Sequence, residues 1–207
     1  MNRKDFLGSI AGGLFAATAM SQGRRIRKVS DGCDGCELIY DGMPATLSNI
    51  AHLPDWNENP QKMIVEGRIF KHDGVTPAAD VILYIYHTDS KGRYSAAPNQ
   101  KHALKHGHIR GWIKTGVNGS YRFYTCPPAP YPEHNEPAHI HPVVMEPDTN
   151  EYYIDEYVFE GDPLLTPAYK AKRQNRGGSG VIKLTKNANG WMICKRNIIL
   201  GLNIPNY

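Results

Sequence analysis

Residues 111–125 read GWIKTGVNGSYRFYT, and this stretch decides the fold class. β-Branched and aromatic residues lie on both sides of Asn118-Gly119, a residue pair that is typical of tight turns between antiparallel strands. The pattern predicts a β-hairpin with one strand over 111–115 and the other over 121–125.

Other short runs with strand character continue this pattern in both directions along the chain. Residues 63–70 alternate in polarity, and residues 81–86 form a continuous apolar run typical of a strand buried on both faces. A further strand is predicted over 152–159. Residues 181–185 and 191–199 are expected to pair across a turn at 187–190.

Seven or eight short strands without a segment of helical periodicity predict an all-β fold, an antiparallel β-sandwich with few or no helices in the mature chain. Two long connections, 95–107 and 127–142, interrupt the strand pattern, and both contain histidine. Long loops at the ends of strands commonly carry function, so we expect the active site there.

Length, composition and charge exclude several classes of protein. The 207 residues are 41% hydrophobic and 21% charged, which is typical of a globular chain and unlike a disordered, collagen-like or repeat protein. The formal charge is +4, but residues 1–28 alone carry a net charge of +5. The remaining chain is nearly neutral, so we expect no nucleic-acid partner.

The N-terminus has the pattern of an export signal over residues 1–22. A charged segment, residues 2–5, precedes an apolar run over 6–20 that is too short to span a bilayer comfortably. Arg3-Lys4 resembles a twin-arginine signal, which exports proteins already folded around a cofactor. A buried N-terminal helix is the alternative. We expect a periplasmic or extracellular protein, without a membrane segment in its mature form.

The domain organisation follows from this signal. Residues 23–59 form an N-terminal extension that contains Cys33 and Cys36, and residues 60–207 form the sandwich domain. Together with Cys126 and Cys194 these cysteines allow three disulfide pairings, which the sequence does not separate. A zinc site would need a second pair of closely spaced cysteines, which the sequence lacks. A redox-active Cys-x-x-Cys would need a thioredoxin-like βαβ unit around it, and no such pattern is present. Structural disulfides are favoured.

Two histidines form the sharpest local signal, at the end of Pro137-Ala138-His139-Ile140-His141. Residues i and i+2 of an extended segment face the same side, so His139 and His141 present two imidazoles side by side. That spacing can place two nitrogens on one metal ion, and packing or surface histidines are the alternative. Tyr131 lies eight residues upstream between two prolines, and Tyr94 follows the turn after the buried strand.

With these residues the chain resembles the intradiol ring-cleavage dioxygenases, the non-haem ferric enzymes exemplified by the protocatechuate and catechol dioxygenases. The chain is similar to the smaller secreted members of that family. The similarity extends from about Val65 to about Gly201 and rests on five motifs in the family's order. These are Gly92-Arg93-Tyr94, Arg110-Gly111 with the strand Gly119 to Thr125, Pro130-Tyr131-Pro132, Pro137 to His141, and Phe159 to Pro163.

The resemblance implies a metal site and a reaction. Tyr94, Tyr131, His139 and His141 would bind Fe(III), whose charge favours phenolate over phenol. The enzyme would cleave a small aromatic diol with O2 between its two hydroxylated carbons and give a muconate-type diacid. Tyr131 would act as the catalytic base on leaving the metal. Arg110 would assist substrate or oxygen binding, although a structural salt bridge is an equal alternative. A homo-oligomer is left open.

Three carboxylates depart from the family pattern. Glu136 replaces an arginine immediately before Pro-Ala-His, Glu156 replaces a glutamine, and Glu133 replaces a tryptophan of the protocatechuate enzymes. Negative charge near the site would repel an acidic substrate. We therefore expect a neutral or cationic catechol.

Other functions remain alternatives. The chain could be a metal-binding pseudoenzyme that holds iron or a catechol without turnover, or a non-catalytic, transthyretin-like binding sandwich. A divalent-metal enzyme built from histidines and carboxylates is more distant. The three histidines of 102–108 could themselves bind metal or form a lid, although a solvated loop is the simpler interpretation.

Overall fold

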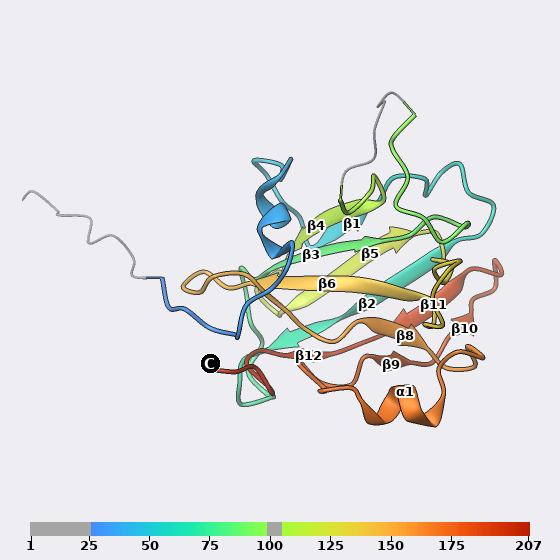
Figure 1. Cartoon of the computed structure of the whole chain (residues 1–207). Coiled ribbons are helices and arrows are strands. Elements are labelled where there is room, and N and C mark those ends of the chain that lie inside the picture. The colour runs from blue at the N-terminus through green and yellow to red at the C-terminus, as the bar shows by residue number, and fades with distance from the viewer. Residues whose placement is uncertain (1–25, 99–104) are drawn as a thin grey trace, which may run out of the picture.

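Two six-stranded sheets pack face to face in the computed structural model, which describes residues 26–98 and 105–207 (Figure 1). The predicted β-sandwich is therefore confirmed. The export signal predicted over 1–22 lies outside the described residues. The strands are β1 Ile50–His52, β2 Met63–Phe70, β3 Ile82–His87, β4 Arg110–Lys114, β5 Ser120–Thr125, β6 His139–Met145, β7 Tyr152–Tyr153, β8 Tyr157–Phe159, β9 Val181–Ile182, β10 Thr185–Lys186, β11 Met192–Lys195 and β12 Ile198–Ile199.

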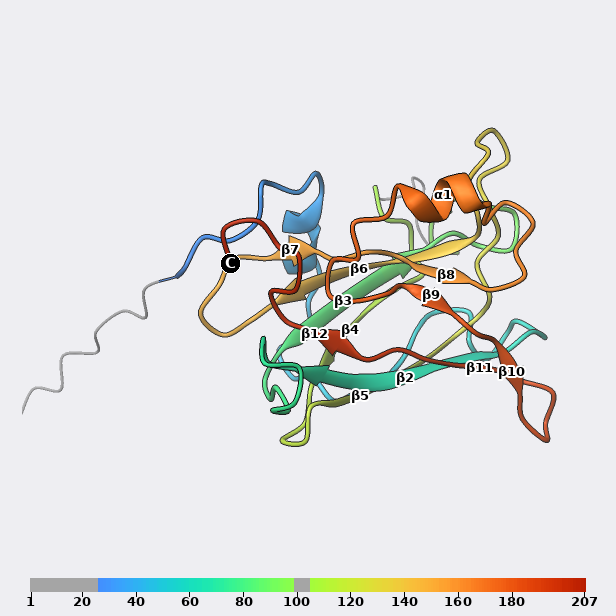
Figure 2. The same cartoon turned by 90° about the horizontal axis from the view of Figure 1, so that it is seen from below.

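The two sheets differ in their strand order. The first sheet has the order β1-β5-β2-β11-β10, and β12 also pairs with β2. The second has the order β4-β3-β6-β8-β9, and β7 also pairs with β6. The long central strands pair antiparallel, whereas β1–β5, β2–β11, β2–β12 and β8–β9 are parallel. Figure 2 shows the sheets as two layers.

The period-two pattern of the sequence places the core between these layers. Ile85 and Ile140 from the second sheet and Phe123 from the first are fully buried. Their neighbours along each strand face outward, because successive side chains of a strand alternate between its two faces. His139 and His141, on either side of Ile140, therefore lie on the outer face of the second sheet.

The predicted hairpin over 111–125 is wrong in its pairing, although both of its strands exist. Strand β4 pairs with β3 in the second sheet, and β5 pairs with β2 in the first. The turn at Asn118-Gly119 forms, with Gly119 at a φ of 70°, but it connects the two layers. Turn residues specify a chain reversal and do not specify which strand becomes the neighbour.

The C-terminal pairing is confirmed only in part. Thr185 lies opposite Ile193 across the predicted turn, as expected. Val181 and Ile182 instead form β9, which pairs in parallel with β8 in the other sheet. The predicted strand 152–159 is split into β7 and β8, and both pair with β6.

The segment before residue 60 packs against the sandwich. Strand β1 adds to the first sheet beside β5, and a 3-10 helix, η1 (Cys36–Tyr40), covers the outer face of the second sheet. There Cys36 and Ile39 pack with Tyr84 and Val143. Figure 2 shows that η1 and the short helix α1 (Pro167–Ala171) lie on the same side of that sheet.

One of the expected structural disulfides forms, between Cys33 and Cys36. Cys126 and Cys194 are buried free thiols. Cys126 follows β5 and Cys194 lies in β11, and these two strands flank β2 in the first sheet. A two-strand separation exceeds the Cα distance that a disulfide spans, about 7 Å at most.

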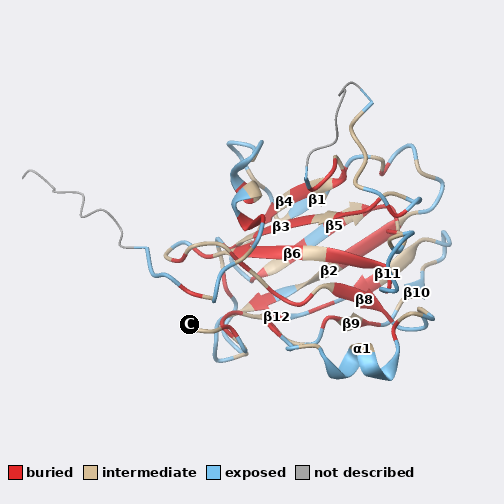
Figure 3. Ribbon diagram, viewed as in Figure 1, coloured by how far each residue is buried: buried red, intermediate tan, exposed pale blue. Residues whose placement is uncertain are grey.

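The expectation of few helices is confirmed. Helix α1 begins with Pro167 after the N-cap residue Thr166, whose side chain accepts a hydrogen bond from the backbone N–H of Tyr169. Figure 3 shows that this helix is exposed, whereas the strands beneath it are mostly buried. Within residues 26–98 and 105–207 no helix is long and apolar enough to cross a membrane.

Candidate metal centre

The four predicted metal ligands meet at one point on the outer face of the second sheet. The hydroxyl oxygens of Tyr94 and Tyr131 are 2.7 Å apart. The Tyr131 hydroxyl lies 3.3 Å from the Nε2 atoms of both His139 and His141. The two Nε2 atoms are 2.9 Å apart. Residues separated by up to 47 positions in the sequence thus bring two nitrogens and two phenol oxygens together.

Strand β6 positions the two imidazoles, as the i, i+2 spacing predicts. His139 is buried, and its Nδ1 donates a hydrogen bond to the carbonyl oxygen of Pro137 at 2.7 Å. In the neutral ring this bond places the lone pair on Nε2, the atom that points toward the other three side chains. The Pro137 carbonyl therefore leaves Nε2 of His139 available to bind a metal ion.

Two loops that touch each other position the tyrosines. The carboxylate of Asp89 accepts hydrogen bonds from the backbone N–H groups of Lys91 and Arg93, which closes the turn before Tyr94. Gly92 has a φ of 73°, and a Cβ there would lie 2.0 Å from the carbonyl oxygen of Pro130. Only glycine allows the Tyr94 loop to come so close to the Tyr131 loop.

Burial favours the neutral form of three side chains at the centre, those of His141, Tyr94 and Tyr131. It lowers the pKa of His141 well below its usual value, and the neighbouring His139 adds to this effect. Burial also raises the pKa of Tyr94, with a further increase from its hydrogen bond to Tyr131. The pKa of Tyr131 is raised mainly by burial, and the carboxylates of Glu136 and Glu156 also raise it.

This donor set fits a ferric ion. Neutral imidazole nitrogens are common ligands of iron, and phenolate oxygens are hard anionic donors that suit a high oxidation state. Because burial opposes free phenolates, a trivalent cation at this point would stabilise the deprotonated tyrosines. Among the described residues no group of three or more His, Cys, Asp or Glu side chains gathers, so the alternative of a histidine–carboxylate metal site has no support there.

Arg110 lies one strand beyond the centre. In the strand register it is opposite Tyr86 of β3, and Tyr86 is in turn opposite His141. Its Nη2 forms an ion pair with Asp41 at 3.1 Å, and its guanidinium lies over the ring of Trp112. The structure thus shows the salt bridge, and the role of Arg110 in substrate or oxygen binding stays a prediction.

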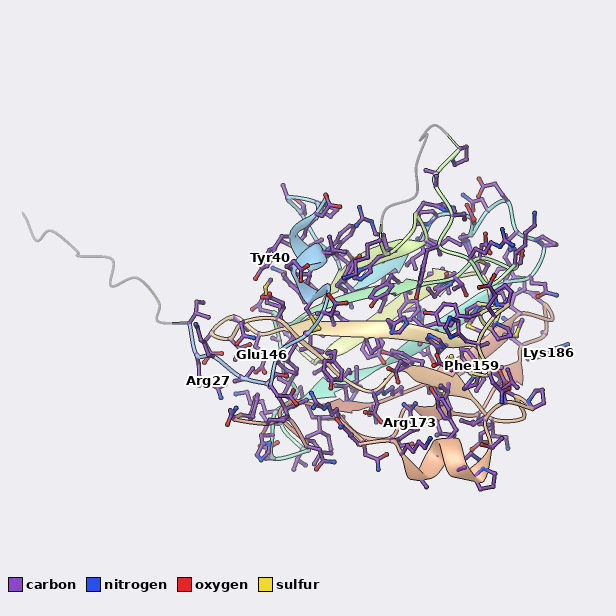
Figure 4. All side chains as sticks on the ribbon, viewed as in Figure 1. Arg27, Tyr40, Glu146, Phe159, Arg173 and Lys186 are labelled. Carbon is purple, nitrogen blue, oxygen red and sulfur yellow. A yellow bond between two sulfur atoms is a disulfide. The ribbon has the colours of Figure 1, made fainter. Side chains whose placement is uncertain are left out.

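The three departures from the family pattern have different surroundings. Glu133 and Glu136 are exposed. Glu156 forms an ion pair with Arg173 at 3.3 Å, and Arg173 also contacts Asp155 at 3.4 Å. The side chain of Arg173 is only 5% exposed, and Figure 4 shows it beside α1. Sequence reasoning missed Arg173, because it lies 17 positions after Glu156 and nothing in the sequence signals the contact.

The histidines of 102–108 do not form a solvated loop where the structure describes them. His106 is buried against Tyr84 and Tyr86. The Nε2 atom of His108 is 3.0 Å from the carboxylate of Asp55, and its Nδ1 is 3.1 Å from the carbonyl oxygen of Ser95. The contact of His108 with Ser95 holds the chain beside Tyr94. His102 lies outside the described residues.

Comparison with known proteins identifies the family of the chain. A family model described as dioxygenase matches residues 39–192, about three quarters of the chain. The chain belongs to the intradiol dioxygenase family. It is 28% identical over 184 residues to catechol 1,2-dioxygenase 1 of Acinetobacter lwoffii, which covers 72% of this chain and 58% of that protein. It is also 28% identical over 112 residues to the protocatechuate 3,4-dioxygenase beta chain of Burkholderia cepacia, covering 51% and 47%.

Solved structures show the same fold. The dioxygenase domain of a dioxygenase–carbohydrate-binding fusion from Streptomyces sp. SirexAA-E superposes with a TM-score of 0.55 at 20% identity, covering 76% of this chain and 91% of that one. The chain spans less than two thirds of the length of the curated relatives named above. Members of this family are oxidoreductases that use non-haem iron.

Proposed function

We propose that this protein binds one ferric ion through Tyr94, Tyr131, His139 and His141 and cleaves a catechol between its two hydroxylated carbons with O2, giving a muconate-type diacid. The observation that carries the proposal is the convergence of these four side chains, whose donor atoms lie 2.7–3.3 Å from one another. A transthyretin-like binding sandwich has no need for such a cluster.

The residues of the chain have separate tasks in this reaction. His139, oriented by the carbonyl oxygen of Pro137, holds its position throughout. Tyr131 contacts all three other side chains and sits on a proline-flanked loop, so in its phenolate form it is placed to take up a proton from the substrate. The ferric ion, when bound, withdraws electron density from the catechol and orients it.

The charges around the centre favour a neutral or cationic catechol. Glu156 is paired with Arg173, whereas Glu136 has no ion-pair partner among the described residues. Glu136 immediately precedes Pro137, and the negative charge of its carboxylate raises the pKa of Tyr131. A substrate carboxylate would meet this negative charge, and a substrate ammonium group would be attracted to it.

A visible spectrum with iron analysis, recorded before and after addition of catechol under air, tests the proposal. A broad charge-transfer band and about one iron per chain are expected for two coordinated tyrosinates, followed by formation of a muconate. A stable colour shift without product would favour the catechol-binding pseudoenzyme. A colourless protein that stays iron-free after reconstitution would contradict the iron site itself.

We also propose that the protein is exported to the periplasm or beyond, through residues 1–22. The pattern of this segment and the disulfide between Cys33 and Cys36 support an oxidising compartment. Cell fractionation of the full chain tests this, with a variant that replaces Arg3 and Lys4 by glutamine as the control. Equal export of both forms would contradict a twin-arginine route.

A further inference from the structure

The two histidines of the centre are held in different ways. His139 donates from Nδ1 to the carbonyl oxygen of Pro137 at 2.7 Å. The Nδ1 atom of His141 has no hydrogen-bond partner among the residues that the structure describes. A metal-binding histidine almost always donates its second N–H to a neighbouring acceptor, and this bond fixes the orientation of its ring. A ring that has no such bond within the protein can be oriented by stacking against a neighbouring ring instead.

The ring of Tyr86 lies flat against His141. Tyr86 is directly opposite His141 in the pairing of β3 with β6, so both side chains stand on the same face of the sheet. The ring centroids are 4.7 Å apart, and the planes are inclined by 14°. The hydroxyl of Tyr86 has no hydrogen-bond partner in the described part of the chain. Its contribution is therefore the flat face of the ring.

The opposite face of Tyr86 is covered by His106. These two rings are 3.5 Å apart and nearly parallel, with an angle of 4° between them. His106 is buried, and its Nδ1 lies 3.1 Å from the hydroxyl of Tyr84, with which it forms a hydrogen bond. Tyr86 is thus held between an anchored histidine and His141.

The disulfide-closed loop of the N-terminal segment supports His106 from outside. Gly35 lies between Cys33 and Cys36 with a φ of 84°, and a Cβ on it would lie 2.9 Å from Nε2 of His106. Asp34 of the same loop forms an ion pair with Lys105 at 2.7 Å. The loop therefore packs on the edge of the His106 ring.

We propose that Tyr86 is a positioning residue that holds the imidazole of His141 toward Tyr131 and His139. The ring of His106 and the disulfide loop Cys33–Cys36 support Tyr86 from behind. The inference rests on the proposed function only in naming His141 as a metal ligand. It assigns a task at the site to a segment of the chain that precedes the sandwich domain.

Three variants of the full chain test the proposal. Tyr86→Leu removes the flat ring, Tyr86→Phe keeps the ring without its hydroxyl, and Tyr124→Leu removes a matched tyrosine that stacks on His52 at 4.3 Å in the other sheet. We expect Tyr86→Leu to lose iron to a chelator at least ~10-fold faster than the parent and to shift the charge-transfer band. Tyr86→Phe and Tyr124→Leu should stay within about 2-fold of the parent, as expected for changes outside the oriented contact.

The same variants without iron separate this proposal from the proposed function. In the iron-free parent, nitrogen-15 NMR should show His141 as one ordered, neutral imidazole, and Tyr86→Leu should broaden or split that signal while the His139 signal is unchanged. A parent that binds no iron would contradict the proposed function, yet this NMR comparison would still decide the role of Tyr86. Identical His141 signals in the parent and Tyr86→Leu would overturn it.

A variant on the far side of the stack covers the case in which Tyr86→Leu does not fold. Gly35→Ala places a methyl group against His106 and strains a positive φ. It should therefore displace the stacked rings although neither Tyr86 nor His141 is substituted. We expect faster iron loss and a perturbed His141 signal, each smaller than in Tyr86→Leu. An unchanged His141 signal in Gly35→Ala would contradict support by the disulfide loop.

Discussion

The two outer faces of the sandwich differ in what covers them. The outer face of the second sheet carries aromatic and histidine side chains beneath η1, the two tyrosine loops and α1. The outer face of the first sheet is open and charged, and Glu66, Arg68, Arg122 and Lys195 line a hollow of about 750 Å³ on it.

Ion pairs near the two faces differ in their exposure to water. Arg122 and Glu66 on the open face form an ion pair at 2.6 Å, closer than the pair of Arg173 with Glu156 beside the covered face. Water nevertheless screens the first pair, whereas the guanidinium of Arg173 is almost completely buried. The two faces therefore differ in their exposure to water rather than in their strand structure.

The largest effect should follow from removing a proposed metal ligand of the covered face. His141→Ala deletes one of the two nitrogens that meet Tyr131 at 3.3 Å. We expect iron affinity to fall by at least ~100-fold, because losing a ligand should cost no less than losing a hydrogen-bond partner of a ligand, and we expect loss of ring cleavage. Iron titration and O2 uptake measure these effects. Glu66→Gln on the open face is the control, and equal iron binding by both variants would contradict the site.

The next prediction compares Arg173, beside the covered face, with Arg122, on the open face. Arg173→Leu leaves the carboxylates of Asp155 and Glu156 without their shared partner, and Asp155 is buried. We expect the free energy of unfolding to fall by about 3 kcal/mol, because an unpaired buried charge remains. Arg122→Leu should cost less than about 1 kcal/mol. Urea denaturation measures both, and equal losses would show that burial does not decide the value of these ion pairs.

A pH titration sharpens the comparison further. Burial, together with the positive charges of Lys105 and Arg110, lowers the pKa of His106 to about 4. Between about pH 6.5 and 4, His106 is therefore protonated in the unfolded chain and neutral in the folded protein. The free energy of unfolding falls as the pH decreases through this range. In iron-free protein, His106→Leu should remove up to ~3 kcal/mol of this pH dependence. An unchanged slope in urea denaturation would contradict a neutral His106.

The smallest effect is expected from the exposed carboxylate of the site. Glu136→Gln removes a negative charge next to Pro137 and should raise kcat/KM for a carboxylated catechol relative to catechol by about 3-fold, since water screens an exposed charge. The gain should shrink at high salt. Glu66→Gln is the matched control on the open face. Faster turnover of carboxylated than of neutral catechols by the unaltered protein would contradict the proposed substrate class.

Local patterns in the sequence were sufficient for much of the fold. The alternation in 63–70 and the apolar run in 81–86 predicted β2 and β3 to within one residue at either end. The turn at Asn118-Gly119 was also predicted, yet its strands belong to different sheets. Turn chemistry depends on two residues, whereas strand pairing depends on the burial of whole faces, which the local sequence does not encode.

The sequence by itself determined the pair His139 and His141, because period-two geometry makes i and i+2 neighbours on any strand. Ordered motifs added Tyr94 and Tyr131. Only the tertiary structure decided that Tyr86, His106 and Arg173 stand around the site, since strand register and loop packing bring these distant residues together. These contacts depend on segments that cover the outer face of the second sheet. The segments are far apart in the chain, so the local sequence does not reveal the contacts.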